Sequence, residues 1–79
     1  MRVFKSKQAE KFIAKQDAPT RERLNDALSK LPAGDIVPVS GMTDTYRLRV
    51  GGFRALFVKE GDIIKVTIID SRGQIYKNI

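Results

Sequence analysis

Apolar residues recur at helical spacing in two stretches of the first part of the chain. In both they follow the i, i+3, i+4, i+7 spacing of one helical face, between residues 9 and 16 and again between residues 24 and 31. Ser6 precedes the first stretch as a candidate N-cap, and Pro19 suits the first turn of the second. The pattern predicts one helix over about 6–16 and another between Pro19 and Pro32. The two stripes are Ala9, Phe12, Ile13 and Gln16, then Leu24, Ala27, Leu28 and Leu31.

The second half of the chain has the patterns of β-strands. Residues 45–50 alternate apolar with basic, the Gly51-Gly52 pair is typical of a two-residue hairpin turn, and residues 53–59 are rich in aromatic and branched side chains. Residues 63–69 are β-branched at almost every position, which predicts a central strand buried on both faces. Residues 1–4 and 75–76 predict two further strands, and residues 36–42 a loop.

These elements together predict one α+β domain over residues 1–79. The short connection between the helices predicts an N-terminal helical hairpin, because it turns the second helix back along the first. We expect this hairpin to pack on a small, twisted, mainly antiparallel β-sheet of four to five strands.

Pairing across the Gly51-Gly52 turn gathers three arginines on one face of the expected sheet. Arg49 lies opposite Arg54, and Arg47 projects to the same side. Like charges directly opposite each other destabilise a sheet by up to about 1 kcal/mol, so the pair suggests an anion between them. A merely solvated outer face is the structural alternative. We expect no acidic residue at the paired positions.

The alternation of side chains along a strand also predicts where apolar residues lie. Leu56, Val58, Ile63 and Ile69 should join the arginines as an exposed apolar patch, and Ile64, Val66 and Ile68 should face the helices.

Composition narrows the chemistry. The 79 residues include no Cys and no His, which excludes disulfides, thiol nucleophiles and most zinc or haem ligation, and we expect neither a metal nor a cofactor. Fifteen Lys and Arg against nine Asp and Glu give a net charge of +6, which favours a polyanionic partner. No apolar run is long enough for a signal peptide or a spanning helix, so we expect a cytoplasmic protein without a membrane partner.

Four segments resemble the RelE/ParE-type toxins of bacterial type II toxin–antitoxin systems. They are DAPTR at 17–21, LPAGD at 31–35, YRLRVGGFR at 46–54 and DSRGQIY at 70–76, and their order spans nearly the whole chain. In the RelE branch, basic residues and a late tyrosine line a cleft that cuts messenger RNA. The matching positions are Arg47, Arg49, Arg54, Arg72 and Tyr76.

The resemblance implies an mRNA interferase, an endoribonuclease acting without metal on mRNA in the ribosomal A site. Arg54, Arg72 and Tyr76 would be catalytic, and Arg47 and Arg49 would hold the RNA. Relatives often carry Lys at the positions of Arg47 or Arg49 and His at Ser71, so a lysine-type base does not transfer to this chain. The resemblance also implies a cognate acidic antitoxin, with the toxin monomeric alone and part of a larger complex when bound. The alternatives are a ParE-like inhibitor of DNA gyrase, a non-catalytic RNA-binding module, and a basic domain whose arginines only solubilise it.

Overall fold

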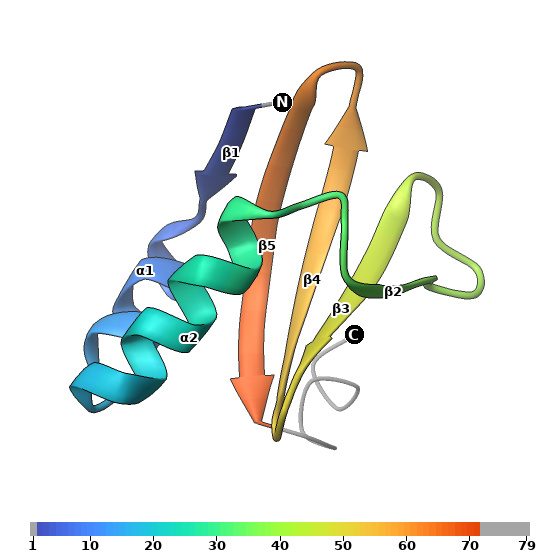
Figure 1. Ribbon diagram of the computed structural model, residues 1–79. Coiled ribbons are helices and arrows are strands. Elements are labelled where there is room, and N and C mark those ends of the chain that lie inside the picture. The colour runs from blue at the N-terminus through green and yellow to red at the C-terminus, as the bar shows by residue number, and fades with distance from the viewer. Residues whose placement is uncertain (1, 72–79) are drawn as a thin grey trace.

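The structure, a computed structural model, describes residues 2–71, which form two helices and a five-stranded sheet (Figure 1). The strands lie in the order β1-β5-β4-β3-β2, with β1 parallel to β5 and every other pair antiparallel. The predicted α+β class is confirmed, and the sheet is mixed. The elements are β1 (Arg2–Lys5), α1 (Lys7–Ala14), α2 (Ala18–Ser29), β2 (Asp35–Pro38), β3 (Thr45–Val50), β4 (Phe53–Glu60) and β5 (Ile63–Ser71).

Each helix begins at a capping side chain: Ser6, the predicted N-cap, for α1, and Asp17 for α2. The Ser6 hydroxyl accepts a hydrogen bond from the backbone N–H of Ala9 at 3.1 Å, and the Asp17 carboxylate accepts one from Thr20 at 3.1 Å. The bonds from Thr20 stabilise the charged carboxylate and lower the pKa of Asp17 below its ordinary value. Pro19 lies in the first turn of α2, where its missing N–H costs nothing.

The core lies between the helices and one face of the sheet. Helix α1 packs on β5 and helix α2 against β3, and Figure 1 shows the two helices side by side next to the strands. Both predicted stripes turn inward, with Phe12 and Ala27 half-buried at the margin. The buried cluster consists of Ala9, Ile13, Leu24, Leu28, Leu31, Leu48, Val50, Ala55, Phe57, Ile64, Val66 and Ile69.

A β-bulge in β5 changes the predicted alternation. Leu56 pairs with Ile68 but Phe57 pairs with Val66, so Thr67 is an extra residue. Beyond the bulge each side chain points to the face opposite to the predicted one. Ile69 is completely buried in the core, whereas Ile68 shares the other face with Leu56, so both of these predictions were wrong. The predictions for Ile64 and Val66, which precede the bulge, are confirmed.

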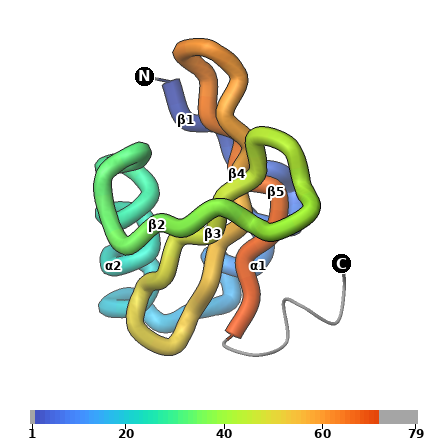
Figure 2. The backbone as a smooth tube through the Cα atoms, turned by 90° about the vertical axis from the view of Figure 1, so that its right-hand side faces the viewer, coloured from blue at the N-terminus to red at the C-terminus, as the bar shows by residue number. Residues whose placement is uncertain are grey.

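Two further predictions about the strands need correction. Asp35–Pro38, expected within or beside a loop, is strand β2, which runs along the outer edge of β3 (Figure 2). The strand expected at the centre, β5, lies between β1 and β4, and β4 is the middle strand. Only one face of β5 is packed by helix, so exposed Lys65 and half-buried Ile63 remain outside the core. The short strand predicted at 75–76 lies outside the described residues.

Candidate nucleic-acid interface

The two arginines of the predicted pair lie at the centre of a charged row that crosses four strands. Arg49 and Arg54 are direct partners across β3 and β4, as the sequence predicts. On the outer sides, Asp35 of β2 is the partner of Arg49, and Asp70 of β5 is the partner of Arg54. Cross-strand partners project to the same side of a sheet. The row therefore reads Asp, Arg, Arg, Asp on the face opposite the helices, which we call the arginine face.

The acidic ends of this row contradict the expected absence of acidic partners. Asp35 was missed because its segment was expected to be a loop and so had no strand partner. Without the bulge at Thr67, continuous pairing from the turn before β5 would have placed Ile69 opposite Arg54, and the extra residue brings Asp70 there instead. The two β-branched residues Ile36 and Val37 were the one available sequence signal for β2. The sequence carries no comparable signal for the bulge at Thr67.

A second row, mostly apolar, lies next to the charged one. It consists of Val37, Arg47, Leu56 and Ile68 on β2, β3, β4 and β5. Leu56 is only 2% exposed although it lies outside the helix-covered core cluster. Arg47 thus lies between two apolar neighbours, where a lower local dielectric strengthens its interaction with an anion.

The expected exposed apolar patch beside the arginines is not found as predicted. Leu56 is buried, Val58 and Ile63 are half-buried, and Ile69 faces the core. Among the residues that the structure describes, the large hydrophobic side chains that are exposed are Phe4, Val37 and Met42. Val37 alone of these belongs to the row of Arg47.

The three arginines differ in burial. Arg47 and Arg54 are half-buried and their Nε atoms are buried, so their aliphatic stems and the base of each guanidinium are held within the face. Arg49 is exposed, and within residues 2–71 its guanidinium forms no hydrogen bond and no ion pair. An anion approaching from solvent would therefore meet Arg49 directly, beside a more rigidly held Arg54.

The arrangement suits one anionic group between β3 and β4. A guanidinium binds a phosphate through two parallel N–H donors and keeps its charge at any physiological pH. The flanking aspartates repel anions from the outer strands and so confine the favourable position to the central pair. No group of three or more carboxylate side chains that could hold a metal ion occurs in residues 2–71.

The other two predicted site residues, Arg72 and Tyr76, lie outside the described residues. Strand β5 ends at Ser71, the partner of Phe53, one position along from the charged row. The assignment of Arg72 and Tyr76 to the site stays a prediction.

Comparison with known proteins identifies the fold. The chain is similar to a chain of the RelB–RelE antitoxin–toxin complex from Methanococcus jannaschii, with a TM-score of 0.79 and 23% identity over 98% of this chain and 99% of that one. It is also similar to a chain of the archaeal RelE–RelB complex from Pyrococcus horikoshii OT3, with a TM-score of 0.74 and 25% identity over 92% and 96% of the two chains. No protein-family model and no curated protein matches the sequence. Two helices on a five-stranded mixed sheet are thus the fold of RelE structures.

No helix within the described residues has the length and apolar character needed to cross a membrane.

Proposed function

We propose that this protein is a RelE-type toxin of a toxin–antitoxin system and acts as an endoribonuclease on mRNA. The observation that carries the proposal is the direct pairing of Arg49 with Arg54, beside Arg47, on the one sheet face that the helices do not cover. Asp35 and Asp70 balance part of this charge from the outer strands, and an RNA phosphate would bind at the positive centre between the two arginines. The similarity to two RelE–RelB complexes over nearly the whole chain supports the same function.

The chemistry of the proposal needs no metal. The 2′-hydroxyl of the RNA attacks the adjacent phosphorus, loses its proton to a base, and expels the 5′-oxygen, which takes up a proton. The products are a 2′,3′-cyclic phosphate and a free 5′-hydroxyl. Negative charge builds up on the phosphate oxygens in the transition state, and fixed guanidinium donors stabilise it.

The five predicted residues share three roles in this reaction. Arg54, whose Nε is buried, and Arg72 stabilise the phosphate; exposed Arg49, together with Arg47, holds the RNA backbone. Tyr76 stacks on a base or carries a proton. The ribosomal A site would hold the 2′-hydroxyl, the phosphorus and the leaving 5′-oxygen of the message in line. This alignment would lower the entropic part of the activation free energy of cleavage.

An acidic antitoxin is the second proposed partner. A net charge of +6 and a basic sheet face favour a partner of opposite charge, and both similar structures are complexes with RelB. We infer a cytoplasmic toxin that is monomeric alone and forms a larger complex with its antitoxin.

Induction in bacteria tests the proposal. Primer extension on a reporter message should show breaks within the translated region after brief expression of the wild-type chain. Arg54→Ala should abolish them, because the phosphate loses a fixed donor. Lys59→Ala is the matched control: it removes a cation from the other end of β4, on the opposite face, and should leave the breaks in place.

Circular dichroism and thermal unfolding of the purified variants must first show that both fold. Growth arrest with intact messages would contradict the nuclease and favour gyrase inhibition. Equal cleavage by folded Arg54→Ala would contradict the role of Arg54.

A further inference from the structure

Arg23, a residue of α2 that the sequence did not single out, lies against the tip of the β3–β4 hairpin. Its Nη1 atom is 3.4 Å from the position that a Cβ atom would occupy on Gly51. Gly51 and Gly52 connect Val50 to Phe53, and Arg49 and Arg54 are the next residues on either side. A helix and a hairpin thus bring a third guanidinium group to the same end of the molecule.

The Gly51-Gly52 turn between Arg49 and Arg54 is exposed and has no side chains that would block a ligand. Gly51 and Gly52 are both exposed and carry no side chain, and a Cβ atom on Gly52 would meet nothing within 4 Å. Gly51 has a φ of 56°, a conformation that favours glycine. The backbone of a polymeric ligand could therefore cross the turn in close contact with the protein.

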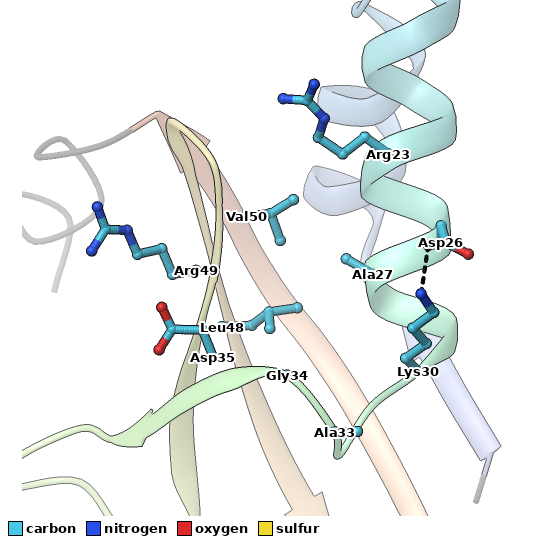
Figure 3. Close-up of a pocket in the computed structure, with 10 residues that line it drawn as sticks. All are labelled: Arg23, Asp26, Ala27, Lys30, Ala33, Gly34, Asp35, Leu48, Arg49 and Val50. Atoms are coloured by element: carbon cyan, nitrogen blue, oxygen red, sulfur yellow. Dashed lines mark ion pairs between the residues drawn. The ribbon is translucent and has the colours of Figure 1, made fainter.

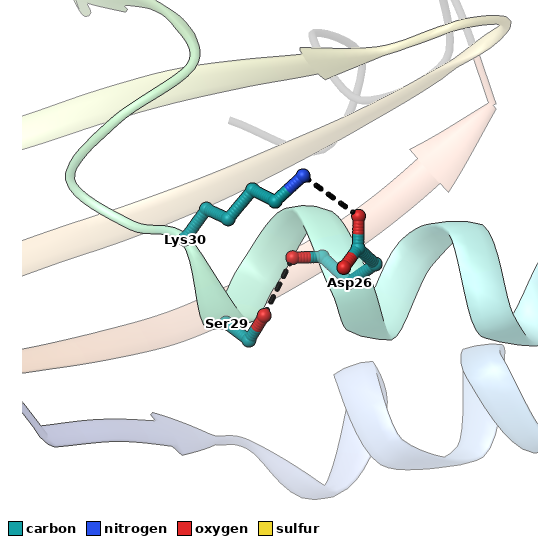
Figure 4. Close-up of polar contacts among 3 residues, drawn as sticks. All are labelled: Asp26, Ser29 and Lys30. Atoms are coloured by element: carbon teal, nitrogen blue, oxygen red, sulfur yellow. Dashed lines mark hydrogen bonds and ion pairs between the residues drawn. The ribbon is translucent and has the colours of Figure 1, made fainter.

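Arg23 is also available to bind an anion. It borders a groove between α2 and β3, with a volume of about 250 Å³, whose floor is formed by Ala27, Leu48 and Val50 (Figure 3). Lys30, at the other end of the groove, is paired with Asp26 at 3.0 Å, while Ser29 donates to the Asp26 carbonyl (Figure 4). Within residues 2–71 the guanidinium of Arg23 has no hydrogen bond and no ion pair.

Arg21, the other arginine of α2, is hydrogen-bonded within the described residues, unlike Arg23. Arg21 donates from Nη1 to the carbonyl of Gln16 at 2.7 Å, so it helps to hold the connection between the helices. In Figure 3 the side chain of Arg23 instead extends from α2 toward the end of β3, beside Val50.

From these observations we infer that the RNA-binding surface continues from the arginine face across the Gly51-Gly52 turn to Arg23. In this inference, which rests on the proposed function, the Arg49–Arg54 pair holds one phosphate and Arg23 holds another phosphate of the same strand. Arg23 is a positioning residue: it fixes the direction in which the strand leaves the site and takes no part in bond breaking. The ligand class is single-stranded RNA long enough to reach around the hairpin tip.

Salt dependence of binding to a single-stranded RNA oligonucleotide tests this inference. The logarithm of the affinity falls with the logarithm of the salt concentration, and each neutralised phosphate of a single strand contributes about 0.7 to the slope. Arg23→Gln should reduce the slope by about 0.7, and Arg23→Lys should restore it because the charge returns. Lys59→Gln, an equal loss of charge at an exposed position at the far end of β4, should leave the slope unchanged.

A second variant tests the path across the turn. Gly52→Glu adds a negative side chain where the structure leaves space, so it should fold and should weaken binding by about two- to fivefold at low salt. Gly52→Ala, which adds bulk without charge, should weaken binding less.

The outcomes separate this inference from the proposed function. If Arg49→Gln reduces the slope but Arg23→Gln behaves like Lys59→Gln, the path to Arg23 is wrong and RNA binding by the arginine face stands. If the wild-type chain does not bind the oligonucleotide, and translating ribosomes leave the message intact as well, both fail.

Discussion

At the scale of single residues, the aspartates beside the arginines define where an anion can bind. Asp35 and Asp70 bracket Arg49 and Arg54, so the face has a narrow positive centre. The Asp70 carboxylate also accepts a hydrogen bond from the N–H of Ser71 at 2.8 Å, which orients it along β5. If the ligand is RNA, as proposed, the two aspartates would weaken its non-specific binding along the rest of the sheet and favour one position at the arginine pair.

Removing these charges should strengthen binding. Asp35→Asn and Asp70→Asn should each raise the affinity for single-stranded RNA by about two- to fivefold at low salt, since one unfavourable charge interaction near the surface is typically worth up to about 1 kcal/mol. Asn retains the acceptor oxygen for Ser71. Fluorescence anisotropy measures the change, with Asp62→Asn, at the far turn of the sheet, as the control. Unchanged or reduced affinity in both variants would mean that neither aspartate repels the ligand.

The sequence predicted the arginine pair correctly because its pairing depends on local signals, and it missed the aspartates because theirs does not. The pairing of Arg49 with Arg54 depends on a two-residue turn between adjacent strands, which is a local signal. The pairing of Arg54 with Asp70 depends on the β-bulge at Thr67. There the Thr67 hydroxyl donates a hydrogen bond at 3.3 Å to the carbonyl of Leu56, eleven residues earlier in the chain. Arg23 was missed because its position beside Gly51 depends on how α2 packs on the sheet.

At the scale of elements, the start of α1 extends the edge of the sheet beyond β1. The backbone N–H of Ser6 donates to the carbonyl of Val66 at 2.9 Å, and its hydroxyl donates to that of Thr67 at 2.6 Å. The Gln8 side chain then donates to the carbonyl of Ile69 and accepts from its N–H, both at 2.9 Å. Side chains of α1 therefore take the place of a neighbouring strand and hold β5 next to Asp70.

Gln8→Glu tests this role of α1. A carboxylate cannot donate to the Ile69 carbonyl, so we expect a loss of about 1 to 2 kcal/mol in the free energy of unfolding and faster hydrogen exchange at the Ile69 amide. Urea denaturation and exchange measured by NMR provide the two values. Glu10→Gln, an exposed change on the same helix, is the control. Exchange at Ile69 equal to that of the control would show that Gln8 does not hold the strand.

The helices were easier to predict than the sheet edges. The caps Ser6 and Asp17 act within three residues of the N–H groups that they bind, so the helix starts can be read locally. Strand β2 has four residues, includes Pro38 and pairs only with β3, so its identity as a strand depends on partner residues that lie 8 to 14 positions further along the chain.

At the scale of the whole molecule, the two faces of the sheet have different roles. The helices and the Leu48 side of the sheet form the core, and the opposite side carries the arginines. The charged row lies near the Gly51-Gly52 end of the strands, where α2 adds Arg23. The class of this fold followed from the order of helix and strand patterns, but the position of each charge required the register of all five strands.

The proposed reaction requires the arginine pair to bind a phosphate that the neighbouring 2′-hydroxyl attacks. The most direct measurement is single-turnover cleavage of a short message held in purified ribosomes, with one defined codon in the A site. Wild-type protein should cut within that codon and leave a 2′,3′-cyclic phosphate. A deoxyribose at the scissile nucleotide should prevent cutting.

Arg54→Lys, which keeps the charge but loses the two-pronged contact, should slow the cut by about a hundredfold or more, as removal of one oriented donor does in other enzymes. A message left intact by the wild-type protein, or a cut that is equally fast with Arg54→Lys or on the deoxyribose substrate, would contradict this mechanism.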